Sequence, residues 1–189
     1  MVQDGSLLES SCPFITEKLG EMEIESIQPY EMLSALPESS RKRFYDMAGF
    51  DYDKFAALFD ASPKKNLIII GTSHADDASA RLQRDYVARI MEQYGAQYDV
   101  FFKPHPADTT SAGYETEFPG LTLLPGQMPF EIFVWALIDR VDMIGGYPST
   151  VFLTVPLDKV RFIFAANAES MARPLNILFR DATDVEWMQ

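Results

Sequence analysis

Residues 66–70, Asn-Leu-Ile-Ile-Ile, form a short apolar run that stops at Gly71. An uninterrupted run of this kind is typical of a strand buried on both faces of a parallel sheet. Strands alternating with helical patterns over residues 66–165 indicate βαβ units, whose crossovers are right-handed. We therefore predict an α/β, Rossmann-like parallel sheet with helices on both faces. Besides 66–70, the expected strands are 100–102, 121–124, 141–144 and 160–164.

The expected helices follow from apolar periodicity and from helix-ending glycines. Residues 79–94 are the clearest, with Leu82, Tyr86, Val87, Ile90, Met91 and Tyr94 on one face and Gly95 at the end. Residues 38–48 and 51–59 form helices before the first strand, residues 107–118 form a polar loop, and residues 1–37 are the least regular part. The other helices are 130–137, with Pro129 at its first position, a short one from Val151 and one near Glu169.

Composition narrows the class of protein. The formal charge of −12 and the pI near 4.5 argue against binding to nucleic acid or anionic lipid. No run is long enough to span a membrane, and the first residues have neither the basic nor the apolar region of a signal peptide. The single cysteine, Cys12, excludes an internal disulfide framework and fits a reducing compartment. We expect a cytoplasmic protein, in which an anionic substrate needs a local cluster of hydrogen-bond donors.

His105 is the first candidate for chemistry. It follows the apolar strand 100–102 and lies between Pro104 and Pro106, which restrict the backbone. The carboxyl end of a parallel strand is where α/β proteins bind ligands. The imidazole is either a loop side chain with a backbone partner or a donor to an anionic leaving group.

Ser149 and Thr150 open the expected helix from Val151, directly after Gly145, Gly146, Tyr147 and Pro148. Their structural interpretation is an N-cap. The functional alternative is a phosphate site, because glycines permit close approach and a helix start offers free N–H groups. The sequence matches neither the Walker A motif nor G-x-G-x-x-G, so nucleoside triphosphate and dinucleotide sites are not indicated.

Glu131 lies in the first turn of its helix, where it either interacts with the helix dipole or accepts the hydroxyls of a ribose. Gly71, Thr72 and Ser73 form either a plain turn or a further set of donors, and Asp4 reads as a turn residue. The sequence contains no metal-ligand spacing and no G-x-S-x-G nucleophile elbow.

Taken in order, Lys103-Pro104-His105-Pro106, Pro129-Phe130-Glu131 and Gly145-Gly146-Tyr147-Pro148-Ser149-Thr150 resemble the donor-binding half of bacterial sialyltransferases of GT-B architecture. Gly71-Thr72-Ser73 is similar to the Gly-Thr-Thr loop of that family. The resemblance spans roughly residues 66–166. The chain departs from the family pattern at Gln3, where an acidic residue is usual, and at Pro104, where glycine is common.

The resemblance implies inverting transfer of sialic acid from CMP-sialic acid to a glycan hydroxyl, with no metal cofactor. His105 would assist departure of the CMP phosphate and Asp4 would be the base. Ser149 and Thr150 would hold the phosphate, Glu131 the ribose, and the backbone of Lys103 and Pro104 the cytosine. The implied donor-binding residues are Gly71, Thr72, Ser73, Lys103, Pro104, Pro106, Glu131, Gly146, Ser149 and Thr150.

We expect an N-terminal appendage at residues 1–62, a remnant of the acceptor-side domain with linking helices, and a nucleotide-sugar-binding domain at 63–189. Most of the family's acceptor domain is missing from this sequence. The chain is therefore a fragment, or works with a partner chain or as a homo-oligomer that supplies this domain, or binds the donor without transfer. Three alternatives stay open: a CMP-binding module without transfer, a GT-B enzyme with another donor such as CMP-Kdo or a UDP-sugar, and a structural interaction protein.

Overall fold

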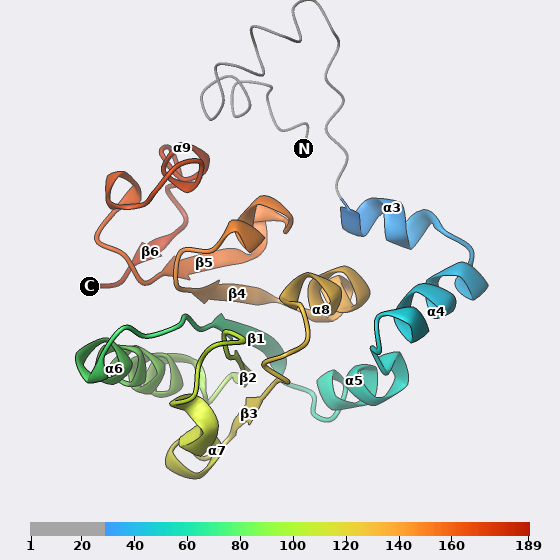
Figure 1. Cartoon of the computed structure of the whole chain (residues 1–189), viewed down its shortest axis with the longest axis horizontal. Coiled ribbons are helices and arrows are strands. Elements are labelled where there is room, and N and C mark those ends of the chain that lie inside the picture. The colour runs from blue at the N-terminus through green and yellow to red at the C-terminus, as the bar shows by residue number, and fades with distance from the viewer. Residues whose placement is uncertain (1–28) are drawn as a thin grey trace, which may run out of the picture.

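The computed structural model describes residues 29–189, in which six parallel strands form one sheet (Figure 1). Their order across the sheet is β3-β2-β1-β4-β5-β6. This is the order of Rossmann folds, in which the direction of winding reverses between β1 and β4. The strands are β1 (Lys65–Ile70), β2 (Tyr98–Lys103), β3 (Leu121–Leu123), β4 (Met143–Gly146), β5 (Val160–Ile163) and β6 (Glu186–Trp187).

Helices connect and cover these strands. The long crossover α6 begins with a capping box, in which the Asp76 carboxylate accepts from the Ser79 N–H and the Ser79 hydroxyl from the Asp76 N–H. None of the helices in residues 29–189 is long and apolar enough to cross a membrane. The α-helices are α3 (Pro29–Ala35), α4 (Glu38–Met47), α5 (Tyr52–Phe59), α6 (Asp77–Tyr94), α7 (Tyr114–Glu117), α8 (Phe130–Leu137) and α9 (Leu175–Leu178). Short 3₁₀ turns are η1 (Ser111–Gly113), η2 (Ile138–Arg140), η3 (Thr150–Leu153), η4 (Leu157–Lys159) and η5 (Ala168–Ser170).

The sheet separates two hydrophobic cores, because successive side chains of a strand point to opposite faces. In β1, Ile68 and Ile70 join the core that contains α5 and α8, whereas Leu67 and Ile69 join the core under α6 and α7. Figure 1 shows these helices distributed around the sheet in this way. The predicted sheet with helices on both faces is confirmed.

The helices before β1 pack against the same core. Phe50 and Phe55 lie edge-on to Phe133 of α8, with ring centroids 5.2 Å and 4.8 Å apart. Phe59 stacks on Phe101 of β2 at 4.2 Å. Edge-to-face and offset aromatic pairs add to the stabilisation from burial alone. Residues 50–59 are therefore continuous with the core of the sheet domain.

Two predictions of irregular structure are wrong. Residues 29–35 form α3, whose start at Pro29 follows the preference of proline for the first turn of a helix. Residues 107–118 are not one polar loop, because they include η1 and α7. Tyr114 of α7 is 1 % exposed and packs against Phe102, so burial of this ring explains the ordered turn.

The fourth strand begins two residues later than predicted, at Met143. The Val141 N–H is already used by the Ile138 carbonyl in the preceding turn, at 3.2 Å. Three further details differ from expectation. Pro129 is the N-cap of α8 rather than its first residue, the helix expected from Val151 is the 3₁₀ turn Thr150–Leu153, and the two-residue strand β6 was not predicted.

Candidate functional site

The loops after β1, β2 and β4 meet at one edge of the sheet. Ile70, the last residue of β1, pairs with Lys103 at the end of β2 and with Gly146 at the end of β4. The residues that follow these strands therefore emerge side by side, at the reversal point where Rossmann-like folds bind ligands. This edge holds Gly71, Thr72, Ser73, His105, Ser149 and Thr150. Asp4 lies outside the described residues.

His105 is exposed and its ring is held by the backbone. Its Nδ1 accepts a hydrogen bond from the Ala107 N–H at 3.1 Å, and its carbonyl accepts from the Asp108 N–H at 2.9 Å. Because a neutral imidazole carries one proton, an accepting Nδ1 places that proton on Nε2. The geometry thus leaves His105 with an available Nε2–H donor at the carboxyl end of β2.

The buried Lys103 side chain holds the start of the His105 loop. The side chain is 4 % exposed, and its ammonium donates to the carbonyls of Pro104 and Gly126, each at 2.9 Å. Burial lowers the pKa of Lys103 to about 8, although the nearby Glu131 charge opposes this shift. The Lys103 side chain thereby ties the His105 loop to the turn that precedes α8.

The two prolines around His105 have different surroundings. Pro104 is buried, while Pro106 is exposed and its carbonyl accepts from Gln127 Nε2 at 3.1 Å. Together with the two Lys103 contacts, this bond makes three hydrogen bonds that hold the His105 loop. One lies within the loop, and the other two join it to residues 126 and 127. The loop is therefore held in one conformation before any ligand arrives.

Ser149 is the N-cap of η3, as its structural interpretation predicts. Its Oγ accepts from the Val151 N–H at 3.3 Å, and the side chain is half-buried. The hydroxyl hydrogen of Ser149 remains available, because the contact uses only a lone pair of the oxygen. Thr150 is exposed beside it. The arrangement offers two hydroxyl donors at the carboxyl end of β4.

Gly145 and Gly146 are explained by packing within the sheet. A Cβ on Gly145 would lie 2.5 Å from the Phe162 ring, and one on Gly146 would lie 2.2 Å from the Ile70 carbonyl oxygen. Gly146 also has φ +128°, a conformation that other residues rarely adopt. The pair therefore has a structural cause that does not require a phosphate.

Glu131 is half-buried in the first turn of α8, where it lies within electrostatic range of Lys103. Its carboxylate forms no hydrogen bond or ion pair with other described residues. Gly71 donates its N–H to the Lys103 carbonyl at 3.0 Å, which continues the sheet past β1. The Glu131 carboxylate oxygens therefore have no partner within residues 29–189 at this edge.

Gln83 was missed by the sequence analysis and joins two of these loops. Its amide is fully buried; Oε1 accepts from the Thr72 N–H at 2.9 Å, and Nε2 contacts Asp108 Oδ2 and the Tyr114 hydroxyl, both at 3.4 Å. Asp108 in turn accepts from the Thr110 N–H at 2.7 Å. Gln83 therefore positions the loop of Thr72 relative to the loop of His105.

The buried stripe of α6 explains why Gln83 was missed. Leu82, expected on the apolar face, is 45 % exposed, whereas the buried positions are Gln83, Tyr86, Val87 and Ile90. These four follow the spacing i, i+3, i+4, i+7 of a helix face. The sequence signal for Gln83 was therefore its position: a polar residue at the first place of a helix face whose other residues are apolar or aromatic.

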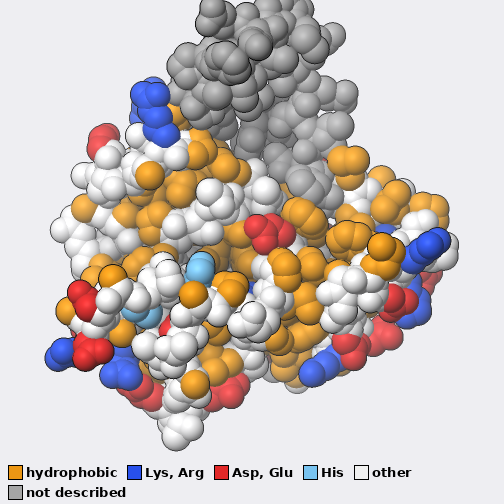
Figure 2. Space-filling model, viewed as in Figure 1, with side chains coloured by type: hydrophobic (Ala, Val, Ile, Leu, Met, Phe, Trp, Pro, Cys, Tyr) orange, Lys and Arg blue, Asp and Glu red, His pale blue; other side chains and the backbone are white. Residues whose placement is uncertain are grey.

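Positive side chains are not concentrated at the candidate site. On the face of the molecule seen in Figure 2, the histidine atoms are pale blue, and most of the visible lysine and arginine side chains lie toward the margins of that face. Residues 29–189 contain no group of three or more His, Cys, Asp and Glu side chains placed to hold a metal ion. An anion bound at this edge would rely on N–H groups, hydroxyls and the imidazole.

Comparison with solved structures identifies the fold. The chain superposes on the GT-B domain, residues 113–497, of a sialyltransferase from Photobacterium damselae with a TM-score of 0.73 and 22% identity, covering 98% of this chain and 54% of that one. An α/β-galactoside α-2,3-sialyltransferase from Photobacterium phosphoreum gives a TM-score of 0.69 at 23% identity, over 96% of this chain and 52% of that chain.

A third structure is the 2,6-sialyltransferase of Photobacterium sp. JT-ISH-224 in complex with CMP and lactose, at a TM-score of 0.69 and 19% identity, over 97% and 41% of the two chains. No protein-family model and no curated protein matches the sequence. The chain spans about half the length of the solved structures that it resembles. Its structural neighbours are bacterial sialyltransferases, and it has the Rossmann-like fold of their GT-B domain.

Proposed function

We propose that this chain binds the donor of a sialyltransferase-like glycosyltransferase, and that the donor is CMP-sialic acid. The observation that carries the proposal is the convergence of His105, Ser149 and Thr150 at the carboxyl ends of β2 and β4. Glu131 joins them through the turn that Lys103 anchors. The fold shared with sialyltransferase structures supports the same assignment.

The contacts proposed for Ser149, Thr150 and Glu131 use groups that the geometry leaves available. The Ser149 hydroxyl holds the Val151 N–H with its oxygen and donates its hydrogen to the phosphate of CMP. Thr150 adds a second hydroxyl. The Glu131 carboxylate accepts the ribose hydroxyls, and the backbone of Lys103 and Pro104 contacts the cytosine. Thr72 and Ser73 line the same edge after β1.

The reaction transfers one sugar with inversion at its anomeric carbon. The acceptor oxygen forms a bond to that carbon while the bond from the carbon to the phosphate oxygen breaks, and CMP departs with the electron pair. His105 Nε2–H donates to the departing phosphate, which neutralises developing charge. Asp4 takes the proton of the acceptor hydroxyl in this scheme.

We expect transfer to require no metal ion. A phosphate monoester is already a good leaving group, and hydroxyl, N–H and imidazole donors stabilise it by preorganised electrostatics. Transfer activity that is unchanged by chelators would support this expectation.

The first test is calorimetric titration of CMP, with UMP and AMP as comparators, into the wild type and three variants: His105→Ala, Ser149→Ala and Glu131→Ala. We expect selective CMP binding that Ser149→Ala and Glu131→Ala each weaken by about 1–3 kcal/mol, because a buried partner is lost. Matched controls are Ser40→Ala on α4 and Glu92→Ala near the end of α6, both at exposed positions in helices that end before β1 and β2 begin. They should bind CMP like the wild type.

The outcomes separate the alternatives. CMP binding without transfer or donor hydrolysis identifies a nucleotide-binding module, and preference for UMP identifies a different nucleotide-sugar donor. If no nucleotide binds, or if the three variants behave like the controls, the donor-site proposal is wrong.

A further inference from the structure

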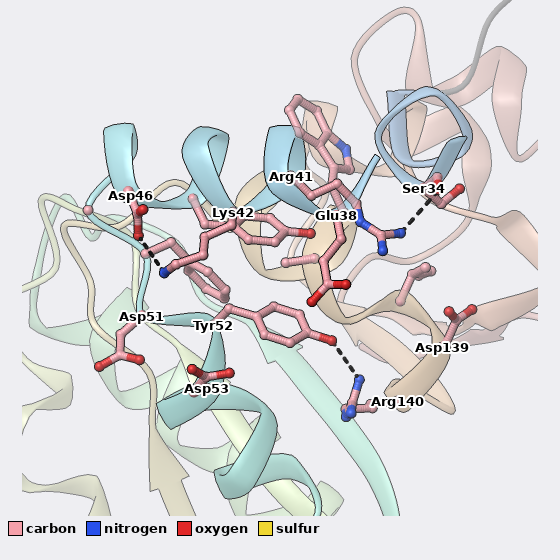
Figure 3. A pocket seen from close by; sticks show the side chains of 16 residues that line it. Ser34, Glu38, Arg41, Lys42, Asp46, Asp51, Tyr52, Asp53, Asp139 and Arg140 are labelled. Carbon is pink, nitrogen blue, oxygen red and sulfur yellow. Dashed lines mark hydrogen bonds and ion pairs between the residues drawn. The ribbon is translucent and has the colours of Figure 1, made fainter. Parts of the chain in front are cut away.

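A pocket of about 620 Å³ lies between α4, α5 and the end of α8 (Figure 3). Its lining includes Ile138, Asp139 and Arg140 of η2, which directly precede β4. The Arg140 carbonyl accepts from Asn66 Nδ2 at 2.8 Å, close to the start of β1. The pocket is therefore at the amino end of the sheet, away from the donor edge at the carboxyl ends. Its volume falls within the range of small-molecule sites.

Two of the three cationic side chains that line this pocket, Arg140 and Lys42, form ion pairs with acidic side chains. Arg140 donates through Nε to both carboxylate oxygens of Asp60, at 3.1 Å and 3.0 Å, and through Nη1 to the Tyr52 hydroxyl at 3.2 Å. Lys42 pairs with Asp46 at 3.4 Å. These contacts shape the walls of the pocket and leave Arg41 as the lining cation without an ion pair among the described residues.

Other polar groups in the lining lack such partners. Figure 3 shows the Glu38 side chain pointing into the pocket, and Glu38 and Asp139 form neither a hydrogen bond nor an ion pair with described residues. Arg41 uses one nitrogen for the Ser34 carbonyl at 3.1 Å. The Trp135 indole N–H is buried with no acceptor in residues 29–189. The pocket thus offers the unpaired acceptors of Glu38 and Asp139 together with the remaining N–H donors of Arg41, whereas the buried Trp135 N–H lies behind the pocket surface.

The lining also has an apolar wall. Tyr45 and Tyr52 stack at 5.3 Å with an interplanar angle of 11°, and Trp135 and Ile138 also line the pocket. Burial raises the pKa of Tyr45, so its hydroxyl remains a donor over the physiological pH range. Aromatic faces beside hydroxyl and carboxylate groups suit a ligand that has both C–H surfaces and polar edges.

These features decide among ligand classes. Five carboxylates against three cations disfavour an anion, and the unpaired charges disfavour a purely apolar molecule. A cation would satisfy Glu38 and Asp139 but would leave the remaining N–H groups of Arg41 without acceptors. Sugar hydroxyls donate and accept at once. We propose that this pocket binds a neutral oligosaccharide. This saccharide site is separate from the donor edge, and its binding does not depend on a ligand bound there.

The test uses the full chain and the two indole N–H signals of its tryptophans, Trp135 and Trp187, in NMR spectra. The Trp187→Phe variant assigns them. Lactose and maltotriose are the probes, with CMP and spermidine as comparators. We expect both saccharides to shift the Trp135 signal in a saturable manner while the Trp187 signal stays in place. Spermidine and CMP should leave the Trp135 signal unchanged.

Variants locate the contact. Glu38→Gln should weaken saccharide binding about five- to tenfold, because glutamine keeps an acceptor oxygen but loses the charge that strengthens its hydrogen bonds. The matched control Glu92→Gln, at an exposed position on α6, should bind saccharide like the wild type. Ser149→Ala should not change saccharide binding, and Glu38→Gln should not change CMP binding, so the two proposals fail separately. The absence of a saturable Trp135 shift, tighter binding of spermidine, or equal effects of Glu38→Gln and Glu92→Gln would each overturn the saccharide site.

Discussion

Gln83 shows how a single buried side chain can set the geometry of a site that it does not enter. Its amide has one acceptor and two donor hydrogens, and its partners among the described residues belong to segments other than α6: Thr72, Asp108 and Tyr114. The Asp108 N–H in turn holds the His105 carbonyl. A buried amide of this kind stabilises only when its partners are all present. Gln83 is therefore a positioning residue for both loops.

Replacing Gln83 with leucine should both destabilise the fold and disturb the donor edge. The Thr72 N–H loses its acceptor, so we expect a loss of about 1–3 kcal/mol in the free energy of unfolding. Urea unfolding measures this loss, with Gln97→Leu, at an exposed position, as the control. If the folded variant binds CMP like the wild type, the positioning role of Gln83 is wrong even where the stability loss is found.

Lys103 should make stability depend on pH in an uncommon direction. Burial lowers its pKa to about 8 from 10.5, so above pH 8 the folded chain releases a proton that the unfolded chain retains up to its higher pKa. The free energy of unfolding therefore rises with pH across this window, because the unfolded state binds more protons there. Below the folded pKa the full cost of burying the ammonium is present.

The measurement compares urea unfolding of the wild type, Lys103→Met and the exposed control Lys65→Met between about pH 7 and about pH 10. The wild type should gain stability relative to Lys103→Met as the pH rises. The difference between the wild type and Lys65→Met should stay constant, since Lys65 is exposed. A flat or falling difference for Lys103→Met would contradict the lowered pKa.

At the scale of elements, the sequence predicted a strand correctly where complete burial allows only apolar residues. Residues 66–70 were predicted as a strand because an unbroken apolar run fits only a position covered on both faces. The fourth strand was placed two residues early because Gly145 and Gly146 carry no apolar signal, although they pair with Ile69 and Ile70. β6 has two residues and no pattern of its own. Pairing between distant segments decides such elements, and a local window does not contain it.

The same limit applied to the candidate site. His105 and Ser149 were identified because each directly follows a recognisable strand, and parallel strands end at the same edge. Gln83 was not identified, because a glutamine in a helix is usually exposed and only tertiary packing places its amide under two loops. The pocket beside α4 was also missed, since its walls come from segments that are distant in sequence.

Gly146 tests whether the end of β4 tolerates any side chain. A Cβ there would lie 2.2 Å from the Ile70 carbonyl oxygen, at φ +128°. We expect Gly146→Ala to cost more than about 2 kcal/mol, since a side chain in this conformation is strained and the contact is with backbone. The matched control is Gly113→Ala, where a Cβ meets nothing within 4 Å. Thermal unfolding that is equally affected in both variants would contradict this account.

At the scale of the whole molecule, the helices that precede the sheet are part of its core. Phe50, Phe55 and Phe59 belong to the cluster that also contains Ile68, Ile70 and Phe133. α3 contacts α8 as well. Separating residues 1–62 from 63–189 would expose apolar surface on both pieces, and buried apolar area is the main stabilising term in folding. The net charge of −12 provides no electrostatic attraction between the two pieces that would compensate for the lost apolar contacts.

We therefore expect the fragment 63–189 to lack a cooperative unfolding transition, because Phe133 and Phe101 lose the aromatic rings that pack on them at 4.8 Å and 4.2 Å. In the full chain, Phe133→Ala should reduce the free energy of unfolding by about 3–5 kcal/mol, the usual cost of removing a buried phenylalanine ring. Leu82→Ala is a control at an exposed position, and it should have little effect. Calorimetry of the fragment and urea unfolding of the variants measure both effects. A fragment that unfolds cooperatively, with the heat expected for its length, would show that the sheet domain is stable without α3, α4 and α5.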